Sequence, residues 1–206
     1  MEKPAHSPDT FLVTQAQKGR DEAFQELVHR HRPGVARLVA RITRRPEWVD
    51  DLTQESFISA YQNLAKFEAR ASFRTWIYRI AVNLSLRELQ KEQARERMRL
   101  AYFEETALPD SLIVPWSATG ERLILSRETQ TLVRKALDQL APEHAIVLVL
   151  RYLEELSSPQ IAEVLQIPAG TVRSRLYHAR LQLAEILSPL LAQPMSPSQE
   201  NVSHEL

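Results

Sequence analysis

The residues whose types and spacing most clearly suit a binding function lie in a short basic segment, 158–181. Its apolar residues recur at helical spacing in two consecutive pieces, with a turn at Pro168 between them. In the second piece Val172, Leu176 and Ala179 form one stripe, so the opposite side of that helix is polar. Guanidinium, hydroxyl and ring groups there can bond to base edges and phosphates in a DNA major groove. The candidate contacts to duplex DNA are Thr171, Arg173, Ser174, Arg175, Tyr177, His178 and Arg180.

An ordinary helical hairpin with solvated arginines would show similar apolar spacing. The turn residues and three arginines on the second helix favour a DNA-binding helix-turn-helix instead. Gln166 stands where many such turns have glycine. We therefore expect a left-handed backbone at Gln166, with a strain of about 1 kcal/mol.

A second candidate surface lies on a helix predicted over residues 47–64. On one side, its apolar residues form a core-facing arc. On the far side, Ile58 stands among carboxylates and amides, an arrangement typical of a protein docking patch. A merely solvated acidic face is the alternative, and periodicity alone does not decide between them. The candidate docking residues are Asp51, Gln54, Glu55 and Ile58.

A third candidate surface follows at residues 67–90. The helix that begins near Phe73 carries aromatic, basic and amide side chains beside its core stripe, which suits single-stranded nucleic acid. The loop before it has small residues near Phe67 and can receive a flipped base. A core position for Trp76 is the alternative. The candidate residues are Phe67, Arg70, Trp76, Arg79, Asn83 and Arg87.

The elements that carry these residues predict an all-α fold of two small helical domains joined by a flexible linker. We expect the first domain over residues 20–99, with its first helix kinked or split at Pro33. The second is expected over residues 128–187, with Ser157 or Ser158 capping the helix-turn-helix. The remaining ranges are expected to be a flexible N-terminus at 1–19, an acidic linker at 100–127 and a flexible tail at 188–206.

Composition excludes several kinds of chemistry. The 206 residues include no cysteine, so thiolate metal sites and cysteine nucleophiles are ruled out. Only four glycines occur, which argues against a glycine-rich phosphate loop.

The net charge is zero, yet residues 20–99 carry 16 basic and 11 acidic side chains, which indicates local contact with a polyanion. No secretory signal and no apolar run of about 18 residues is visible, so we expect a cytoplasmic protein without a membrane span.

Titratable pairs offer little support for catalysis. His29 and His31 are two residues apart, so they point to different sides of a helix and do not suit a metal. Glu154 and Glu155 have no partner base, and the pair at 104–105 has none either, so we expect solvated charge. We therefore expect no catalytic residue, no metal and no cofactor.

Taken together, three motifs resemble the extracytoplasmic-function (ECF) class of bacterial RNA polymerase sigma factors. Residues 50–57 (DDLTQESF) resemble the segment of region 2 that docks on the β′ clamp helices. Residues 71–83 (ASFRTWIYRIAVN) resemble its −10 recognition and melting segment. Residues 161–165 (IAEVL) with 170–176 (GTVRSRL) resemble the region 4 helix-turn-helix that reads the −35 element.

This resemblance implies a transcription initiation factor and not an enzyme. The implied partners are core RNA polymerase, through its β′ clamp helices and β flap, and promoter DNA, with an anti-sigma factor as a further candidate. Where the family often has Asp, this chain has Arg87, which affects the expected promoter preference. A stand-alone helix-turn-helix regulator with a helical dimerisation or ligand domain is the alternative function.

Overall fold

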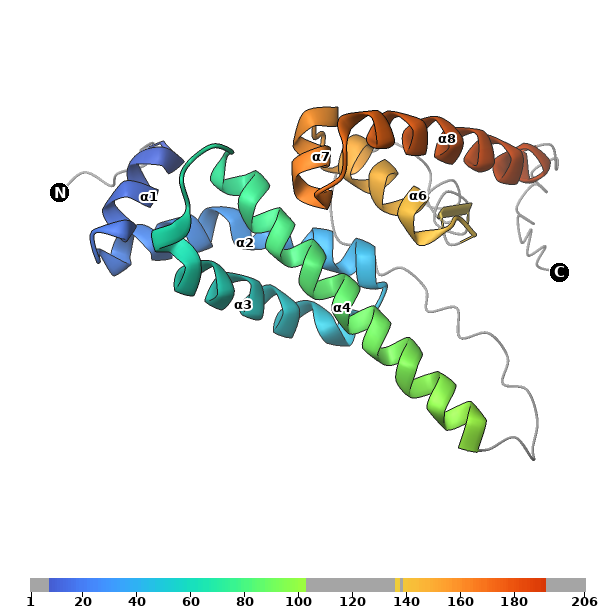
Figure 1. Cartoon of the computed structure of the whole chain (residues 1–206), viewed down its shortest axis with the longest axis horizontal. Coiled ribbons are helices and arrows are strands. Elements are labelled where there is room, and N and C mark those ends of the chain that lie inside the picture. Colours follow the sequence, from blue (N-terminus) through green and yellow to red (C-terminus); the bar gives the residue numbers. More distant parts are fainter. Residues whose placement is uncertain (1–7, 103–135, 138, 192–206) are drawn as a thin grey trace, which may run out of the picture.

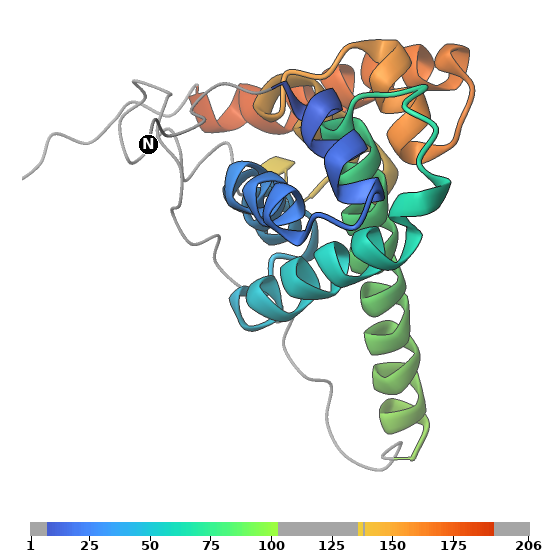
Figure 2. The same cartoon turned by 90° about the vertical axis from the view of Figure 1, so that its left-hand side faces the viewer.

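The computed structural model describes residues 8–102, 136–137 and 139–191. These residues form helices and connecting loops without a strand. This confirms the all-α prediction. Figures 1 and 2 show two groups of helices, with the second group lying beside the N-terminal half of the long helix α4. The first domain comprises α1 (Asp9–Gln17), α2 (Asp21–Thr43), α3 (Pro46–Asn63), the short helix η1 (Leu64–Lys66) and α4 (Phe73–Tyr102). The second comprises α6 (Pro142–Leu148), the π-helical turn η2 (Val149–Leu153), α7 (Ser158–Leu165) and α8 (Ala169–Leu191).

The core of the first domain lies where α2, α3 and α4 meet. Leu27, Leu38, Ala60 and Ile77 are fully buried there. Helix α2 passes through Pro33 without ending, so of the two expected outcomes, a kink or a split, the split does not occur. Apolar residues on both sides of the proline pack on α3 and α4, and this burial outweighs the lost backbone hydrogen bond.

Helix α1 corrects the prediction of a flexible N-terminus for residues 9–17. Leu12, Val13 and Ala16 are buried in the core cluster of the first domain. The helix ends at Gln17, and two residues later Gly19 has a φ of +82°, a left-handed value that favours glycine. Because nine residues make little more than two turns, the periodic pattern was too short to stand out in the sequence.

The second domain has the predicted helix-turn-helix. Ser157 caps α7 in a capping box with Gln160, and Gln166 has the expected left-handed backbone, with φ 54° and ψ 43°. Helix α8 continues to Leu191, so the expected tail is helical over residues 188–191. Helix α4 reaches Tyr102, so residues 100–102 of the expected linker are helical, whereas residues 103–127 of that linker and residues 192–206 of the tail lie outside the described residues.

The two domains meet around Glu154, which is only 2% exposed. This overturns the expectation of a solvated carboxylate. Arg41 of α2 forms an ion pair with one carboxylate oxygen. The other oxygen accepts a hydrogen bond from the Tyr78 hydroxyl at 2.7 Å and lies 3.4 Å from Nη2 of Arg74. Nη2 of Arg74 also donates to the backbone carbonyl of Glu154 at 2.8 Å, so α4 holds both the side chain and the main chain.

The local backbone places Glu154 at this junction. Its amide nitrogen donates to the carbonyl of Val149 at 3.0 Å, a five-residue bond that closes the π-helical turn. Glu155 follows in the left-handed region with φ 56°, which turns the chain toward α7. Burial, together with the charge of Glu154, raises the pKa of Tyr78 to about 12, so the phenol remains a hydrogen-bond donor at neutral pH.

Gly34 of α2 is the residue that makes room for this hydroxyl. A Cβ at position 34 would lie 2.7 Å from Oη of Tyr78 and 3.7 Å from the nearest ring carbon. Tyr78 is only 2% exposed, so the atoms packed around its ring leave little room for it to move away from a Cβ at position 34. Glycine is normally a weak helix former, so its place inside α2 follows from this contact.

We predict that Gly34→Ala destabilises the protein by about 1–3 kcal/mol, because the added methyl displaces the Tyr78 hydroxyl from Glu154. In a Tyr78→Phe background the clash is absent, and the same change should be neutral or stabilising by up to about 1 kcal/mol. Urea unfolding of the four proteins of this double-mutant cycle measures the coupling. An equal loss in both backgrounds would show that the hydroxyl does not set the requirement for glycine.

Candidate nucleic-acid interface

Helix α8 separates a buried side from an exposed one as its periodicity predicts. Val172 and Ala179 are fully buried and Leu176 is 8% exposed. Tyr177 on the other side is 54% exposed. The exposed candidates are Arg173, Ser174, Tyr177, His178 and Arg180, whereas Thr171 and Arg175 are half-buried.

The exposed side of α8 carries both cations and ordered aromatic rings. Within the described part of the chain, Arg173, Arg175 and Arg180 form no ion pair, so their guanidinium groups are available to an external anion. His178 stacks against His144 of α6, with ring centroids 6.4 Å apart. Nδ1 of His144 in turn lies 2.7 Å from Oε1 of Gln182, which links the first turn of α6 to α8. The surface can therefore offer both mobile charges and fixed hydrogen-bonding groups to a duplex.

The candidate single-strand surface is only partly exposed. Arg70 and Arg87 are exposed, and Arg79 and Asn83 are half-buried along α4. Arg70 pairs with Glu68 at 2.7 Å, and both side chains are largely exposed, so this pair exchanges readily with solvent ions. These four residues leave polar groups along the loop and the first half of α4.

Two aromatic rings of that surface lie elsewhere than expected. Phe67 is 9% exposed and Trp76 is 8% exposed, so both rings are buried. Their ring centroids are 4.8 Å apart, and Phe73 packs against both of them. Because the rings cover one another, neither presents an open face for stacking on a base in this structure. The core alternative for Trp76 is the one that the structure supports.

The candidate docking residues on α3 are exposed as predicted. Asp51, Gln54 and Glu55 are exposed, and Ile58 is 49% exposed between them. The patch borders a groove of about 550 Å³ between α2 and α3, with Phe24 and Val28 on its α2 side.

The sequence reasoning missed Tyr61, which also lines this groove and is 50% exposed. Its hydroxyl donates to Oδ1 of Asp21 at 2.8 Å, which links α3 to the start of α2. Tyr61 lies three residues after Ile58 and therefore on the same side of the helix. That spacing was the signal that could have identified it.

Metal and membrane sites are not found among the described residues. They contain no group of three histidine, aspartate or glutamate side chains that could hold a metal ion. His31 instead lies 2.7 Å from a carboxylate oxygen of Asp9. None of the described helices is both long enough and apolar enough to cross a bilayer.

Comparison with known proteins gives two matches to family models, in the order that the sequence motifs predict. Residues 27–95 match Sigma-70 region 2, and residues 130–183 match Sigma-70 region 4. The chain is 35% identical over 189 residues to the ECF RNA polymerase sigma-E factor of Salmonella typhimurium, covering 89% of this chain and 96% of that protein. It is also 35% identical over 184 residues to the sigma-E factor of Haemophilus influenzae, covering 89% of this chain and 97% of that protein.

Solved structures agree with the helical fold. CnrH, in complex with the cytosolic domain of CnrY, matches with a TM-score of 0.64 and 26% identity over 89% of this chain and 99% of that one. The sigma factor RpoE of Bartonella quintana, in complex with the anti-sigma factor NepR, shares the fold with a TM-score of 0.60 and 20% identity, covering 80% of this chain and 96% of that one.

A stand-alone helix-turn-helix regulator would account for the second domain only. Here the region 2 match covers α3 and most of α2 and α4, the helices that carry the docking patch and the candidate single-strand residues. The curated relatives extend across both domains at more than a third identity. The chain therefore belongs to the family of ECF RNA polymerase sigma factors, which bind core RNA polymerase and direct it to promoters.

Proposed function

We propose that this sigma factor divides its task among the three surfaces described above. The patch of Asp51, Gln54, Glu55 and Ile58 docks on the β′ clamp helices of core polymerase. The loop after η1 and the polar side of α4, with Arg70, Arg79, Asn83 and Arg87, capture the unpaired −10 strand. Helix α8 reads the −35 duplex, while the second domain contacts the β flap. These roles need binding alone, so we assign no catalytic step to the chain.

The observation that carries the proposal is the exposed polar side of α8, where Arg173 and Arg180 form no ion pair with any described residue. Arg173 lies near the N-terminal end of the helix, on its exposed side and one turn before Tyr177. From there its guanidinium can reach the O6 and N7 acceptors of a guanine, a contact worth about 1–3 kcal/mol of discrimination. Arg180 lies about two turns further along the helix, where a phosphate is the more accessible partner.

We predict that Arg173→Ala relaxes the preference at one or two −35 positions. Arg180→Ala should weaken all sequences alike and flatten the log–log salt slope by about 0.9, the loss expected for one phosphate contact. The measurement is binding of the reconstituted holoenzyme to a −35 library at two salt concentrations. If both variants keep the wild-type preference and salt slope, α8 does not read the promoter.

The role of the α3 patch is supported by an apolar side chain held outside the core. Ile58 is 49% exposed, although the neighbouring Phe57 on the same helix is 6% exposed. Exposed acidic and amide groups around an apolar centre match the usual anatomy of a protein interface. The adjoining groove extends this surface toward α2 and offers space for a side chain of the polymerase.

We predict that Ile58→Glu weakens binding of core polymerase by about tenfold or more, because interface centres carry most of the binding energy. Gln54→Ala should have a smaller effect in the same direction. The melting temperature and the helical circular dichroism signal should stay nearly unchanged, since position 58 is half in solvent. The control is Met98→Glu, at an apolar residue that is 74% exposed near the far end of α4. Gross unfolding of the Ile58 variant, or equal losses for Met98→Glu, would contradict the docking role.

An anti-sigma partner belongs to the same proposal. CnrH was solved with the cytosolic domain of a second protein, CnrY, bound to it, and this supports a bound regulator for the present chain as well. Because transcription proceeds in the bacterial cytoplasm, we propose that the protein acts there.

A further inference from the structure

Helix α1 bonds directly to the start of the loop that the proposed function assigns to −10 capture. The side-chain amide of Gln17, the last residue of α1, donates to two backbone carbonyls. Nε2 lies 3.0 Å from the carbonyl oxygen of Leu64 and 2.9 Å from that of Phe67. One amide nitrogen therefore joins the first and last residues of the turn that leads from η1 into the loop.

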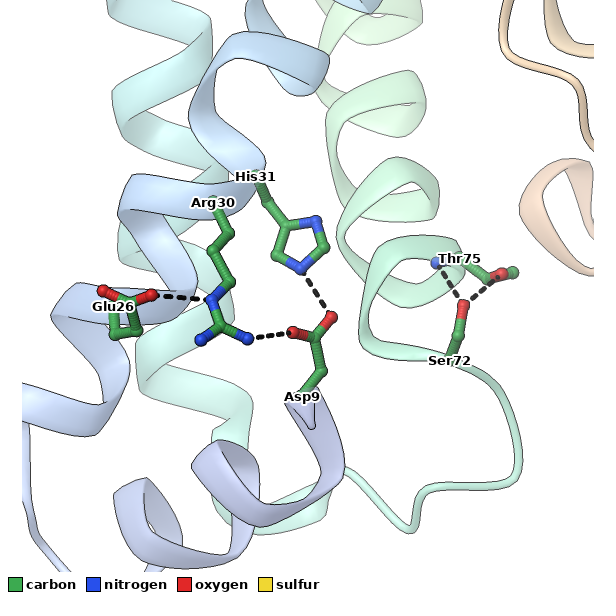
Figure 3. Close-up of polar contacts among 6 residues, drawn as sticks. All are labelled: Asp9, Glu26, Arg30, His31, Ser72 and Thr75. Carbon is green, nitrogen blue, oxygen red and sulfur yellow. Dashed lines mark hydrogen bonds and ion pairs between the residues drawn. The ribbon is translucent and has the colours of Figure 1, made fainter. Parts of the chain in front are cut away.

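The N-terminal end of α1 is hydrogen-bonded to α2 and lies close to the point where the same loop enters α4. Figure 3 shows the carboxylate of Asp9 between Arg30 and His31. Nη1 of Arg30 lies 3.4 Å from one oxygen of Asp9, and Nε2 of His31 lies 2.7 Å from the other. The ring of His31 packs on Phe73, the first residue of α4, with centroids 5.3 Å apart. Helix α1 thus connects, directly or through His31, to the residues at both borders of the loop.

Within the loop, the borders are fixed and the tip is exposed. At the α4 border, Oγ of Ser72 accepts a hydrogen bond from the backbone nitrogen of Thr75 at 3.1 Å (Figure 3). Between the borders, Glu68, Ala69 and Arg70 are exposed. Ala69 has φ 56°, a strained value for a residue with a side chain, so the surroundings must hold this conformation.

We propose that α1 is a positioning element for the −10 capture loop and that Gln17 is its positioning residue. The amide of Gln17 holds the carbonyls of Leu64 and Phe67 so that the loop keeps its open conformation before DNA arrives. A preorganised loop captures an unpaired base without first losing conformational freedom. This inference rests on the proposed function of the loop, and it assigns α1 a part in strand opening.

The test compares full-length variants in holoenzyme with core polymerase. The promoter is a genomic fragment selected by run-off transcription with the wild-type protein, used as an intact duplex and as the same fragment with a mismatched −10 segment. Gln17→Glu keeps the side-chain length but presents a carboxylate that cannot donate, and Gln17→Ala removes both bonds. Thr14→Ala is the matched control, because Thr14 is exposed on α1 and, among the described residues, its hydroxyl bonds to the carbonyl of Thr10 in the same helix.

Both Gln17 variants should open the intact duplex about fivefold to tenfold more slowly, the effect expected from two lost neutral hydrogen bonds. Opening on the mismatched template, affinity for core polymerase and melting temperature should change little, as should every property of Thr14→Ala. A purely structural role would instead lower the melting temperature and slow both templates alike, which would overturn the inference.

Asn83→Ala separates failure of this inference from failure of the proposed function. If Asn83→Ala slows opening of the duplex and the Gln17 variants do not, α1 does not position the loop, and the capture role stands. If neither Asn83→Ala nor Arg70→Ala affects opening, the capture role itself is wrong, and the role of α1 falls with it.

Discussion

The arrangement of the two domains depends on one buried carboxylate. Burying a charged side chain to 2% exposure costs free energy of folding unless the charge is paired and hydrogen-bonded. Glu154 belongs to the second domain, and its three side-chain partners belong to the first. Removing any one partner leaves the remaining charges less compensated, so the cluster acts as a unit. The π-helical turn, the left-handed Glu155 and the glycine at position 34 each serve to place or accommodate this contact.

With the domains packed in this way, the surfaces assigned to function remain largely open. The exposed side of α8 and the patch around Ile58 both face solvent, with Tyr177 at 54% and Ile58 at 49% exposure. The loop proposed to capture the −10 strand is held at its borders and exposed at its tip. Aromatic packing of Phe67 with Trp76 lies beneath the loop and fills the core instead of offering a stacking platform. The candidate contacts of this region are therefore polar side chains on a support of buried rings.

Features that depend on local chemistry were predictable from the sequence. Pro46 at the start of α3, the Ser157 cap and the left-handed Gln166 each follow from the backbone preferences of a few neighbouring residues. The exposure of Ile58 and Arg173 follows from helical periodicity, because the apolar stripe on each helix is wide and unambiguous.

Features that depend on distant partners were not predictable in this way. Glu154 meets Tyr78, Arg74 and Arg41 across 76, 80 and 113 residues of chain, and no spacing within its own segment indicates burial. Trp76 lies on a stripe beside the core stripe of α4, and it is buried because Phe67 from the preceding loop packs over it.

The packing of the domains through Glu154 is tested most directly by a distance measurement. Because the chain has no cysteine, cysteines introduced at the exposed positions Gln25 and Glu185 are the only sites for spin labels. In the free protein, pulsed electron paramagnetic resonance should give one narrow distance distribution. Glu154→Gln should broaden it toward longer distances without loss of helicity, whereas Glu155→Gln, at an exposed neighbour, should leave it unchanged. An identical narrow distribution for Glu154→Gln and the wild type would contradict the role of this carboxylate in holding the domains together.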